Sequence, residues 1–226
     1  MSRLKDSVLP ALVLFDLDDT LCDHDTSLRV RLRYAFQEAM AERERVDLDE
    51  LIEASAKEAI AGTAHFADVL RQRGIDDPAE VTRATERYVQ DRFRGLQLFD
   101  ESLDVVAAVS RHTQVGMITN GPSQIQRDKI RLLKIGELFP IILVSEEEGV
   151  WKPDPDIFAR AVARAGVAAS NAMYIGDSPE HDMAGAQAAG LISVWINRRE
   201  REWPGGPPPD YEIADLRQLL PLLGIA

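Results

Sequence analysis

Short apolar runs alternate with longer amphipathic stretches along much of the chain. The apolar runs, rich in Val, Ile, Leu and Met, lie at residues 11–15, 115–119, 141–145, 172–175 and 192–196, and helical spacing appears at 124–133, 156–165 and 183–189. Continuous apolar character is typical of strands buried on both faces, and strands that alternate with helices build a parallel sheet. The pattern therefore predicts an α/β fold with a doubly wound, Rossmann-like parallel sheet.

The stretch from residue 24 to residue 99 breaks this rhythm. It is polar, rich in Glu, Arg and Ala, and nearly free of strand signals. Apolar residues recur in it at helix-like spacings, namely Tyr34, Phe36, Met40, Leu51, Ile52, Ile60, Phe66, Val69 and Leu70. We therefore expect a helical bundle at 24–99, inserted into an α/β core made of residues 1–23 and 100–226. Residues 211–214 are expected to form an edge strand and residues 216–223 a closing helix.

Charge and cysteine content narrow the possible partners. The 226 residues carry a formal net charge of -12, and such an acidic surface repels nucleic-acid polymers and anionic membranes. No segment reaches the length of a transmembrane helix. A single cysteine, Cys22, cannot form an internal disulfide, so we expect a cytoplasmic protein in which Cys22 is a small buried filler.

Polar clusters follow three of the apolar runs. The carboxyl ends of parallel strands meet at one edge of the sheet, which is where ligands bind in this class of fold. In chain order the clusters are Asp16 and Asp18, then Thr119, Asn120 and Gly121, then Asp177 and Ser178, with Asp182 four residues further on. We therefore expect one site built from all of them.

Asp16 and Asp18 form the first candidate group. Side chains two residues apart on an extended chain point the same way. Two carboxylates this close repel each other unless a proton or a cation lies between them, and their oxygens select a hard cation such as Mg²⁺. A carboxylate can also attack phosphorus as a nucleophile. An Asp-rich strand end can equally cap the next turn, so the pair alone leaves both interpretations open.

Asp177 and Asp182 add acidic oxygen at the same edge. Asp177 follows Gly176 at a strand end, so we predict that it is a direct metal ligand. Asp182 and Ser178 are expected to orient the ligands without binding the metal themselves. The segment also suits a helix N-cap, because Ser178 precedes a proline, and the two roles are compatible.

Thr119, Asn120, Gly121 and Lys152 are the candidate phosphate-binding residues. A hydroxyl group and backbone N–H groups at a glycine can bind a phosphate, although a plain turn would use the same residue types. Lys152 lies in a segment with two prolines, which fix the backbone and hold the side chain in one direction. We expect its ammonium group to balance the carboxylates and bind a phosphoryl oxygen.

Together these clusters resemble the haloacid dehalogenase superfamily, and its phosphatase branch in particular. The matching segments occur in the family's order: FDLDDTL at 15–21, ITNG at 118–121, KPDPDIF at 152–158 and GDSPEHD at 176–182. The first and last are specific in combination, and the middle two mainly through their order and spacing. The insertion at 24–99 resembles the family's helical cap, which closes over the site and helps to choose the substrate.

The resemblance implies a role for each matching residue. Asp16 would attack the phosphoryl group and carry it as a phosphoaspartate. Asp18 would protonate the leaving group and then activate the hydrolytic water. Thr119 would bind the phosphoryl oxygens, and Lys152 would steady Asp16. The Mg²⁺ site would comprise Asp16, the backbone carbonyl of Asp18 and Asp177, supported by Asp182.

The expected activity is hydrolysis of a small phosphorylated metabolite, and alternatives remain. Within the family a dehalogenase is disfavoured, because dehalogenases lack the second aspartate, Asp18. A phosphomutase resembling β-phosphoglucomutase carries nearly the same motifs and stays open. A non-catalytic binding protein that retains the fold is a further alternative. The motifs and the size of the insertion resemble nucleotidases and phosphoglycolate phosphatases, so a nucleoside monophosphate or phosphoglycolate is the suggested substrate.

Overall fold

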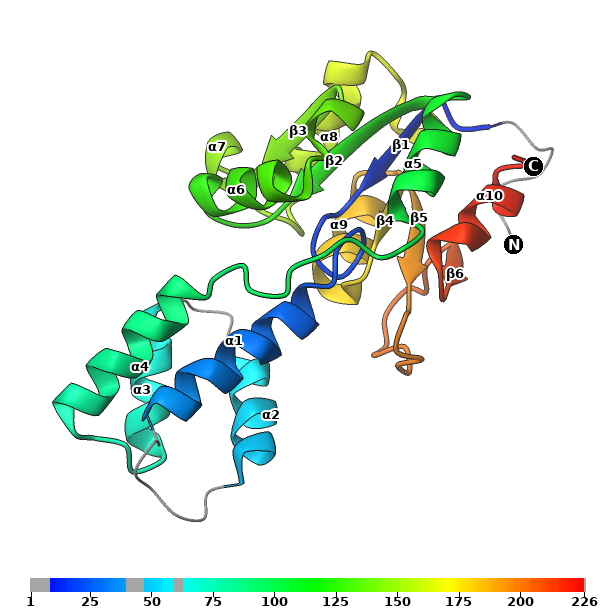
Figure 1. The fold of residues 1–226 in the computed structure, drawn as a ribbon. Helices are drawn as coiled ribbons and strands as arrows, with labels where there is room; N and C mark the ends of the chain where they lie inside the picture. The colour runs from blue at the N-terminus through cyan, green and yellow to red at the C-terminus, as the bar shows by residue number, and fades with distance from the viewer. Residues whose placement is uncertain (1–8, 40–46, 59–62, 226) are drawn as a thin grey trace. The chain divides into compact units, whose positions relative to one another are not determined.

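The computed structural model describes residues 9–39, 47–58 and 63–225 (Figure 1). These residues form two compact units. One joins the chain up to Cys22 to the chain from Leu98 onward, and the other comprises Asp23–Gln97. Each unit has a buried apolar core of its own. None of the described helices has both the length and the apolar character that crossing a bilayer requires.

The described strands of the first unit form one six-stranded parallel sheet in the order β3-β2-β1-β4-β5-β6. Their bounds are β1 Leu12–Phe15, β2 Gln114–Thr119, β3 Ile141–Val144, β4 Ala172–Gly176, β5 Ile192–Ile196 and β6 Tyr211–Ile213. The chain adds β2 and β3 on one side of β1 and then crosses to add β4, β5 and β6 on the other. This topology confirms the predicted doubly wound sheet, and the strand order reverses between β1 and β4.

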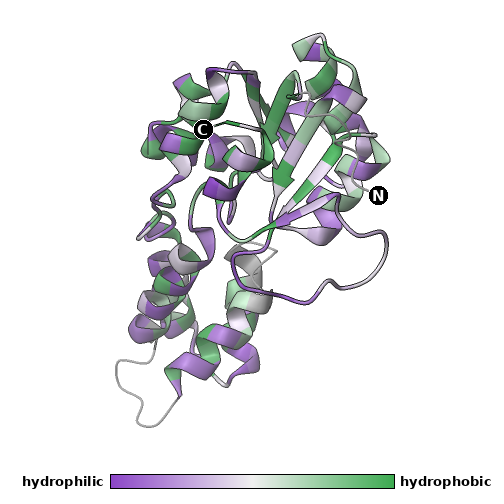
Figure 2. Ribbon diagram, turned by 90° about the vertical axis from the view of Figure 1, so that its right-hand side faces the viewer, coloured by the Kyte–Doolittle hydropathy of each residue, from purple (hydrophilic) through white to green (hydrophobic). Residues whose placement is uncertain are grey.

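Helices cover both faces of this sheet (Figure 1). Leu12 and Leu14 belong to a core shared with α8 (Pro155–Ala165) and α9 (Ala184–Ala188). Val13 and Phe15, which alternate with them, are also fully buried. Helix α5 (Ser102–Ser110) packs against β2, η5 (Leu216–Gln218) and α10 (Leu219–Leu222). Burial on both faces is the reason for the continuous apolar runs, which Figure 2 shows as green along the central strands.

The second unit contains helices α1 (His24–Ala39), α2 (Leu48–Glu58), α3 (Thr63–Gln72) and α4 (Pro78–Gln90). The predicted apolar positions that are buried in its core are Phe36, Leu51, Ile52, Phe66, Val69 and Leu70. Tyr34, which also recurs at helical spacing, is 39% exposed, and its ring lies beside the guanidinium groups of Arg87 and Arg94. Met40 and Ile60 lie outside the described residues.

Several local boundaries differ from the sequence prediction. Ser145 begins the short helix α7 (Ser145–Glu148) and does not extend β3. A π-helical turn, η4 (Pro179–Met183), precedes α9, so the helix expected at 183–189 starts earlier. The closing helix is divided into η5 and α10. Helix α5 was not predicted from the sequence, and the remaining described elements are α6 (Ser123–Leu133), η2 (Gly136–Leu138) and η3 (Ala169–Asn171).

Candidate active site

The first unit brings the polar strand ends together at one edge of its sheet. Asp16 directly follows β1, Thr119 is the last residue of β2, and Gly176 is the last residue of β4. In the parallel register Phe15 lies opposite Ile175, and the Asp16 N–H donates to the Ile175 carbonyl at 2.9 Å. The candidate residues thus share the edge at which parallel sheets bind ligands.

Lys152 connects three side chains from different parts of the chain. Its Nζ atom lies 2.6 Å from Asp16 Oδ1, 2.7 Å from Asp182 Oδ1 and 3.0 Å from the hydroxyl oxygen of Tyr174. The hydroxyl of Tyr174 also lies 3.2 Å from the Ile118 carbonyl oxygen. All four side chains are buried. Because a buried ammonium group is stable only with partners, this network fixes the position of Lys152.

Burial and mutual repulsion shift the pKa values in this network. Burial raises the pKa of Asp16; Lys152 opposes the shift, and Asp182 adds to it. Burial raises the pKa of Asp177 to about 7, helped by the negative charges of Asp182 and Asp19. For Lys152, burial alone would lower the pKa, but Asp16 and Asp182 outweigh it and raise the pKa. Burial is thus the main cause of both carboxylate shifts, and the neighbouring carboxylates add to it.

Three carboxylates meet closely enough to hold one cation. Asp16, Asp177 and Asp182 each offer an oxygen, and these oxygens lie within 4.8 Å of one another. An all-oxygen, negatively charged donor set suits a hard divalent cation such as Mg²⁺, which would also offset the repulsion that adds to the effect of burial on the pKa of Asp16. The side chain of Asp182, predicted only as a support, belongs to this group. The carboxylate of Asp18 does not, and only its backbone carbonyl was predicted as a ligand.

The turn after β4 explains how Asp182 reaches this position. The Ser178 N–H donates to Asp182 Oδ2 at 2.9 Å, and the Ser178 hydroxyl accepts from the His181 N–H at 3.1 Å. The second bond caps the π-helical turn η4, so the predicted capping role of Ser178 is confirmed. The hydrogen bonds of a π-helical turn span one residue more than those of an α-helix, and such turns are frequent at functional sites.

Two residues that the sequence analysis missed hold Asp177. Trp195 Nε1 donates to the backbone carbonyl of Asp177 at 2.8 Å, and an Nη atom of Arg201 donates to the same oxygen at 2.6 Å. Arg201 also lies 3.4 Å from Asp177 Oδ2. Because Trp195 belongs to β5 and Arg201 follows that strand, both contacts depend on the tertiary fold, and neighbouring sequence gives no signal for them.

Asn120 and Gly121 make specific protein contacts in this structure. The Asn120 side-chain amide donates to the Lys152 carbonyl, and its oxygen accepts from the Lys152 N–H, both at 2.9 Å. The Gly121 N–H donates to Ser145 Oγ at 2.9 Å. Asn120 thus positions the backbone of Lys152, and the predicted phosphate contact of these two residues stays a prediction.

Helix α6 adds two polar side chains that the sequence analysis missed. Lys129 Nζ donates to both carboxylate oxygens of Asp18, at 2.8 and 2.7 Å. The amide nitrogen of Gln126 lies 2.6 Å from Thr119 Oγ1 and 3.2 Å from Asp18 Oδ2. The available signal was their spacing of three residues, which places both on one face of a helix directly after the Thr119 cluster.

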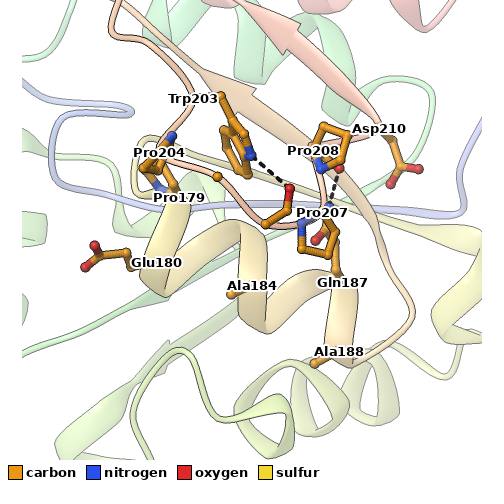
Figure 3. A pocket seen from close by; sticks show the side chains of 12 residues that line it. Pro179, Glu180, Ala184, Gln187, Ala188, Trp203, Pro204, Pro207, Pro208 and Asp210 are labelled. Carbon is orange, nitrogen blue, oxygen red and sulfur yellow. Dashed lines mark hydrogen bonds between the residues drawn. The ribbon is translucent and has the colours of Figure 1, made fainter.

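A separate cavity of about 710 Å³ lies between η4, α9 and the proline-rich segment at 203–210. Figure 3 shows Trp203 and Gln187 at this cavity, with their hydrogen bonds to the carbonyls of Gly206 and Pro208. None of the three clustered carboxylates lines it. The cavity is therefore distinct from the site described above.

The sequence pattern of the haloacid dehalogenase-like hydrolases matches residues 13–196. The chain belongs to this family. Its segments at 15–21, 118–121, 152–158 and 176–182 all lie within the match, and three of them begin or end at the shared sheet edge. The predicted family is confirmed, and the chain is an HAD-like hydrolase.

The relatives of this HAD-like hydrolase include named phosphatases. It is 31% identical over 220 residues to the glyceraldehyde 3-phosphate phosphatase of Methanopyrus kandleri, and the aligned region covers 92% of this chain and 94% of that enzyme. It is 32% identical over 155 residues to the phosphoserine phosphatase of Thermus thermophilus, and the aligned region covers 68% of this chain and only 61% of that enzyme. The solved HAD-hydrolase YfnB of Bacillus subtilis, bound to magnesium, matches with a TM-score of 0.76 and 26% identity over 96% of this chain and 100% of that chain. These names agree with the predicted phosphatase branch.

Proposed function

We propose that this HAD-like hydrolase is a Mg²⁺-dependent phosphomonoester hydrolase that works through a phosphoaspartate on Asp16. The contact that carries the proposal is the 2.6 Å bond between Lys152 Nζ and Asp16 Oδ1. An anionic nucleophile approaches an anionic phosphoryl group only where positive charge offsets their repulsion. Lys152 provides such charge at the carboxylate itself, and it is fixed there by Asp182 and Tyr174.

The reaction has two steps. In the first, a carboxylate oxygen of Asp16 forms a bond to phosphorus while the bond from phosphorus to the ester oxygen breaks, and Asp18 gives its proton to that oxygen. In the second, Asp18 takes a proton from water as the water oxygen attacks phosphorus, which releases phosphate and restores the Asp16 carboxylate. Thr119 binds the phosphoryl oxygens through its hydroxyl group, and Lys152 holds Asp16 throughout.

The donor set described above fits Mg²⁺. The carboxylates of Asp16 and Asp177 and the backbone carbonyl of Asp18 would hold the ion, with Asp182 adjacent to them. When bound, Mg²⁺ supplies charge neutralisation for the transferring phosphoryl group. The magnesium in the structure of the YfnB relative supports this assignment.

The proposed substrate is a small phosphorylated metabolite, with a nucleoside monophosphate or phosphoglycolate as candidates. The names of the relatives widen this set, because they include a pyrimidine 5'-nucleotidase of Escherichia coli as well as the phosphoserine and glyceraldehyde 3-phosphate phosphatases. The substrates that these names give are all phosphomonoesters of small molecules. We therefore propose the class of substrate and leave its identity to a panel.

The test is phosphate release from nucleoside monophosphates, phosphoglycolate, phosphoserine, glyceraldehyde 3-phosphate and hexose phosphates, with Mg²⁺ and with chelator. The variants are Asp16→Asn and, as a matched control, Asp156→Asn on the exposed first turn of α8. We expect release that requires both Mg²⁺ and Asp16 and that Asp156→Asn leaves intact. No release of phosphate from any compound would overturn the proposal, and interconversion of sugar phosphates without release would favour a mutase.

A further inference from the structure

Helix α6 presents two buried polar side chains to the residues that the proposed reaction uses for proton transfer and phosphate binding. Gln126 and Lys129 are 2% and 5% exposed. Lys129 Nζ lies 2.8 and 2.7 Å from the two carboxylate oxygens of Asp18. A lysine is rarely buried so completely unless it is paired, so this contact fixes the orientation of both side chains.

Gln126 connects Asp18 to Thr119. Its amide nitrogen lies 2.6 Å from Thr119 Oγ1, 2.6 Å from the Asn120 carbonyl oxygen and 3.2 Å from Asp18 Oδ2. A carbonyl and a carboxylate only accept hydrogen bonds, so the nitrogen of the amide must face this side. Because the Thr119 oxygen accepts from Gln126, the hydrogen of the Thr119 hydroxyl points elsewhere and can be donated to a phosphoryl oxygen.

We propose that Lys129 and Gln126 are positioning residues that set the side chains of Asp18 and Thr119 for phosphoryl transfer. The inference rests on the proposed function and deepens it, because it assigns the control of two reacting groups to one helix. Asp18 is only partly buried, and Lys129 contacts both of its carboxylate oxygens, whereas Gln126 contacts one. Misplacement of a reacting group by about 1 Å lowers a rate by about 100-fold, so fixing these side chains matters for the rate.

The leaving group of the substrate separates positioning from a merely structural role. An alkyl alcohol leaves only when it is protonated, whereas 4-nitrophenolate leaves without a proton. The value of kcat/KM contains only the steps up to the first phosphoryl transfer, in which Asp18 gives its proton. A variant that misplaces Asp18 should therefore lose far more kcat/KM for an alkyl phosphate than for 4-nitrophenyl phosphate.

The experiment compares Lys129→Met with Lys134→Met, which removes the same charge from an exposed position just after α6. Both substrates are measured, the alkyl phosphate being the best one in the panel above. For Lys129→Met we expect kcat/KM to fall by about 100-fold on the alkyl phosphate and by at least tenfold less on 4-nitrophenyl phosphate. For Lys134→Met we expect no change beyond about twofold, which is usual for a surface substitution.

A second variant, Gln126→Leu, tests the contact with Thr119 and carries the test if Lys129→Met does not fold. We expect it to weaken inhibition by vanadate and to lower kcat/KM for both substrates by about tenfold, the loss of roughly one hydrogen bond to the reacting group. Equal losses of Lys129→Met on both substrates, or losses no larger than those of Lys134→Met, would overturn the role of Lys129. Unchanged vanadate inhibition in Gln126→Leu would overturn the role of Gln126. Wild-type protein that hydrolyses neither substrate would overturn the proposed function itself.

Discussion

A Cβ atom added at Gly176 would meet the Cβ atom of Asp182 at 2.6 Å, closer than real Cβ atoms approach one another. Gly176 ends β4, and Asp182 lies in the π-helical turn η4 that follows. The missing side chain therefore allows the turn to fold back over the strand end. This close approach is what brings the Asp182 carboxylate to Lys152, with 2.7 Å between Oδ1 and Nζ.

Gly176→Ala should therefore impair activity more than stability. The added methyl group must push Asp182 away from Lys152, and a displacement of about 1 Å near a reacting centre costs about 100-fold in rate. Activity on the best substrate and the thermal midpoint would be measured together. Gly136→Ala is the control, because a Cβ there meets only Ile130 Cγ2, at 3.3 Å. Full activity in Gly176→Ala would show that the site does not depend on the position of Asp182.

The hydroxyl group of Tyr174 gives a second prediction. It lies 3.0 Å from Lys152 Nζ and 3.1 Å from Asp182 Oδ1, and both contacts are buried. Tyr174→Phe leaves the buried ammonium group with one acceptor fewer, so we expect the free energy of unfolding to fall by about 1–3 kcal/mol. Urea unfolding would measure this loss, with Tyr34→Phe on the other unit as the exposed control. An unchanged free energy of unfolding would mean that the hydroxyl contributes nothing to the network.

The sheet and its functional edge could be predicted because they follow from local patterns. Runs such as 115–119 are apolar on both faces, and this requires a covered parallel sheet. Once the strands are parallel, Asp16, Thr119 and Asp177 must share an edge, whatever the details of the helices. The shared edge follows without any knowledge of side-chain contacts, so it could be predicted from the sequence.

Residues on the covering helices could not be placed in the same way. Lys129 looks in the sequence like any exposed lysine on an amphipathic helix, and only the rotation of α6 against the sheet turns it toward Asp18. Tyr174 sits in a strand that reads as an ordinary apolar run. Its contact with Lys152 joins residues 22 positions apart, through a loop whose path depends on the packing of α8. Tertiary packing decides such contacts.

The thiol of Cys22 gives a third prediction. Cys22 is fully buried, as expected, and its Sγ lies 3.5 Å from the Leu17 carbonyl oxygen. Burial raises the pKa of the thiol, and the negative charge of Asp18 adds to the shift. Because the thiolate is the reactive form, we expect no reaction of the native protein with a thiol reagent and complete reaction in concentrated urea. Rapid labelling of the native protein, with loss of activity, would contradict a purely structural role.

The ion pair between Arg127 and Glu147 gives a prediction about the pH dependence of stability. Arg127 donates to Glu147 at 2.9 and 2.6 Å, and the Ser123 hydroxyl donates to it at 2.6 Å. The bonds from Arg127 lower the pKa of Glu147 to about 2, although burial acts in the opposite direction. The carboxyl group therefore has a lower pKa in the folded protein than in the unfolded chain, where its pKa is about 4.3.

The sign of the effect follows from proton binding. Between these two pKa values the unfolded chain binds a proton that the folded protein does not, so this contribution to stability is complete above the unfolded value and disappears as the pH falls toward the folded value. Arg127→Met should thus lower the free energy of unfolding at neutral pH by about 0.5–1 kcal/mol, the range for a partly exposed pair. The difference from wild type should shrink as the pH is lowered below about 4. Arg131→Met is the control, since that arginine is 72% exposed and its pair with Asp128 should contribute little. A difference that grows toward acid pH would contradict this assignment, because it would require a pKa for Glu147 that folding raises.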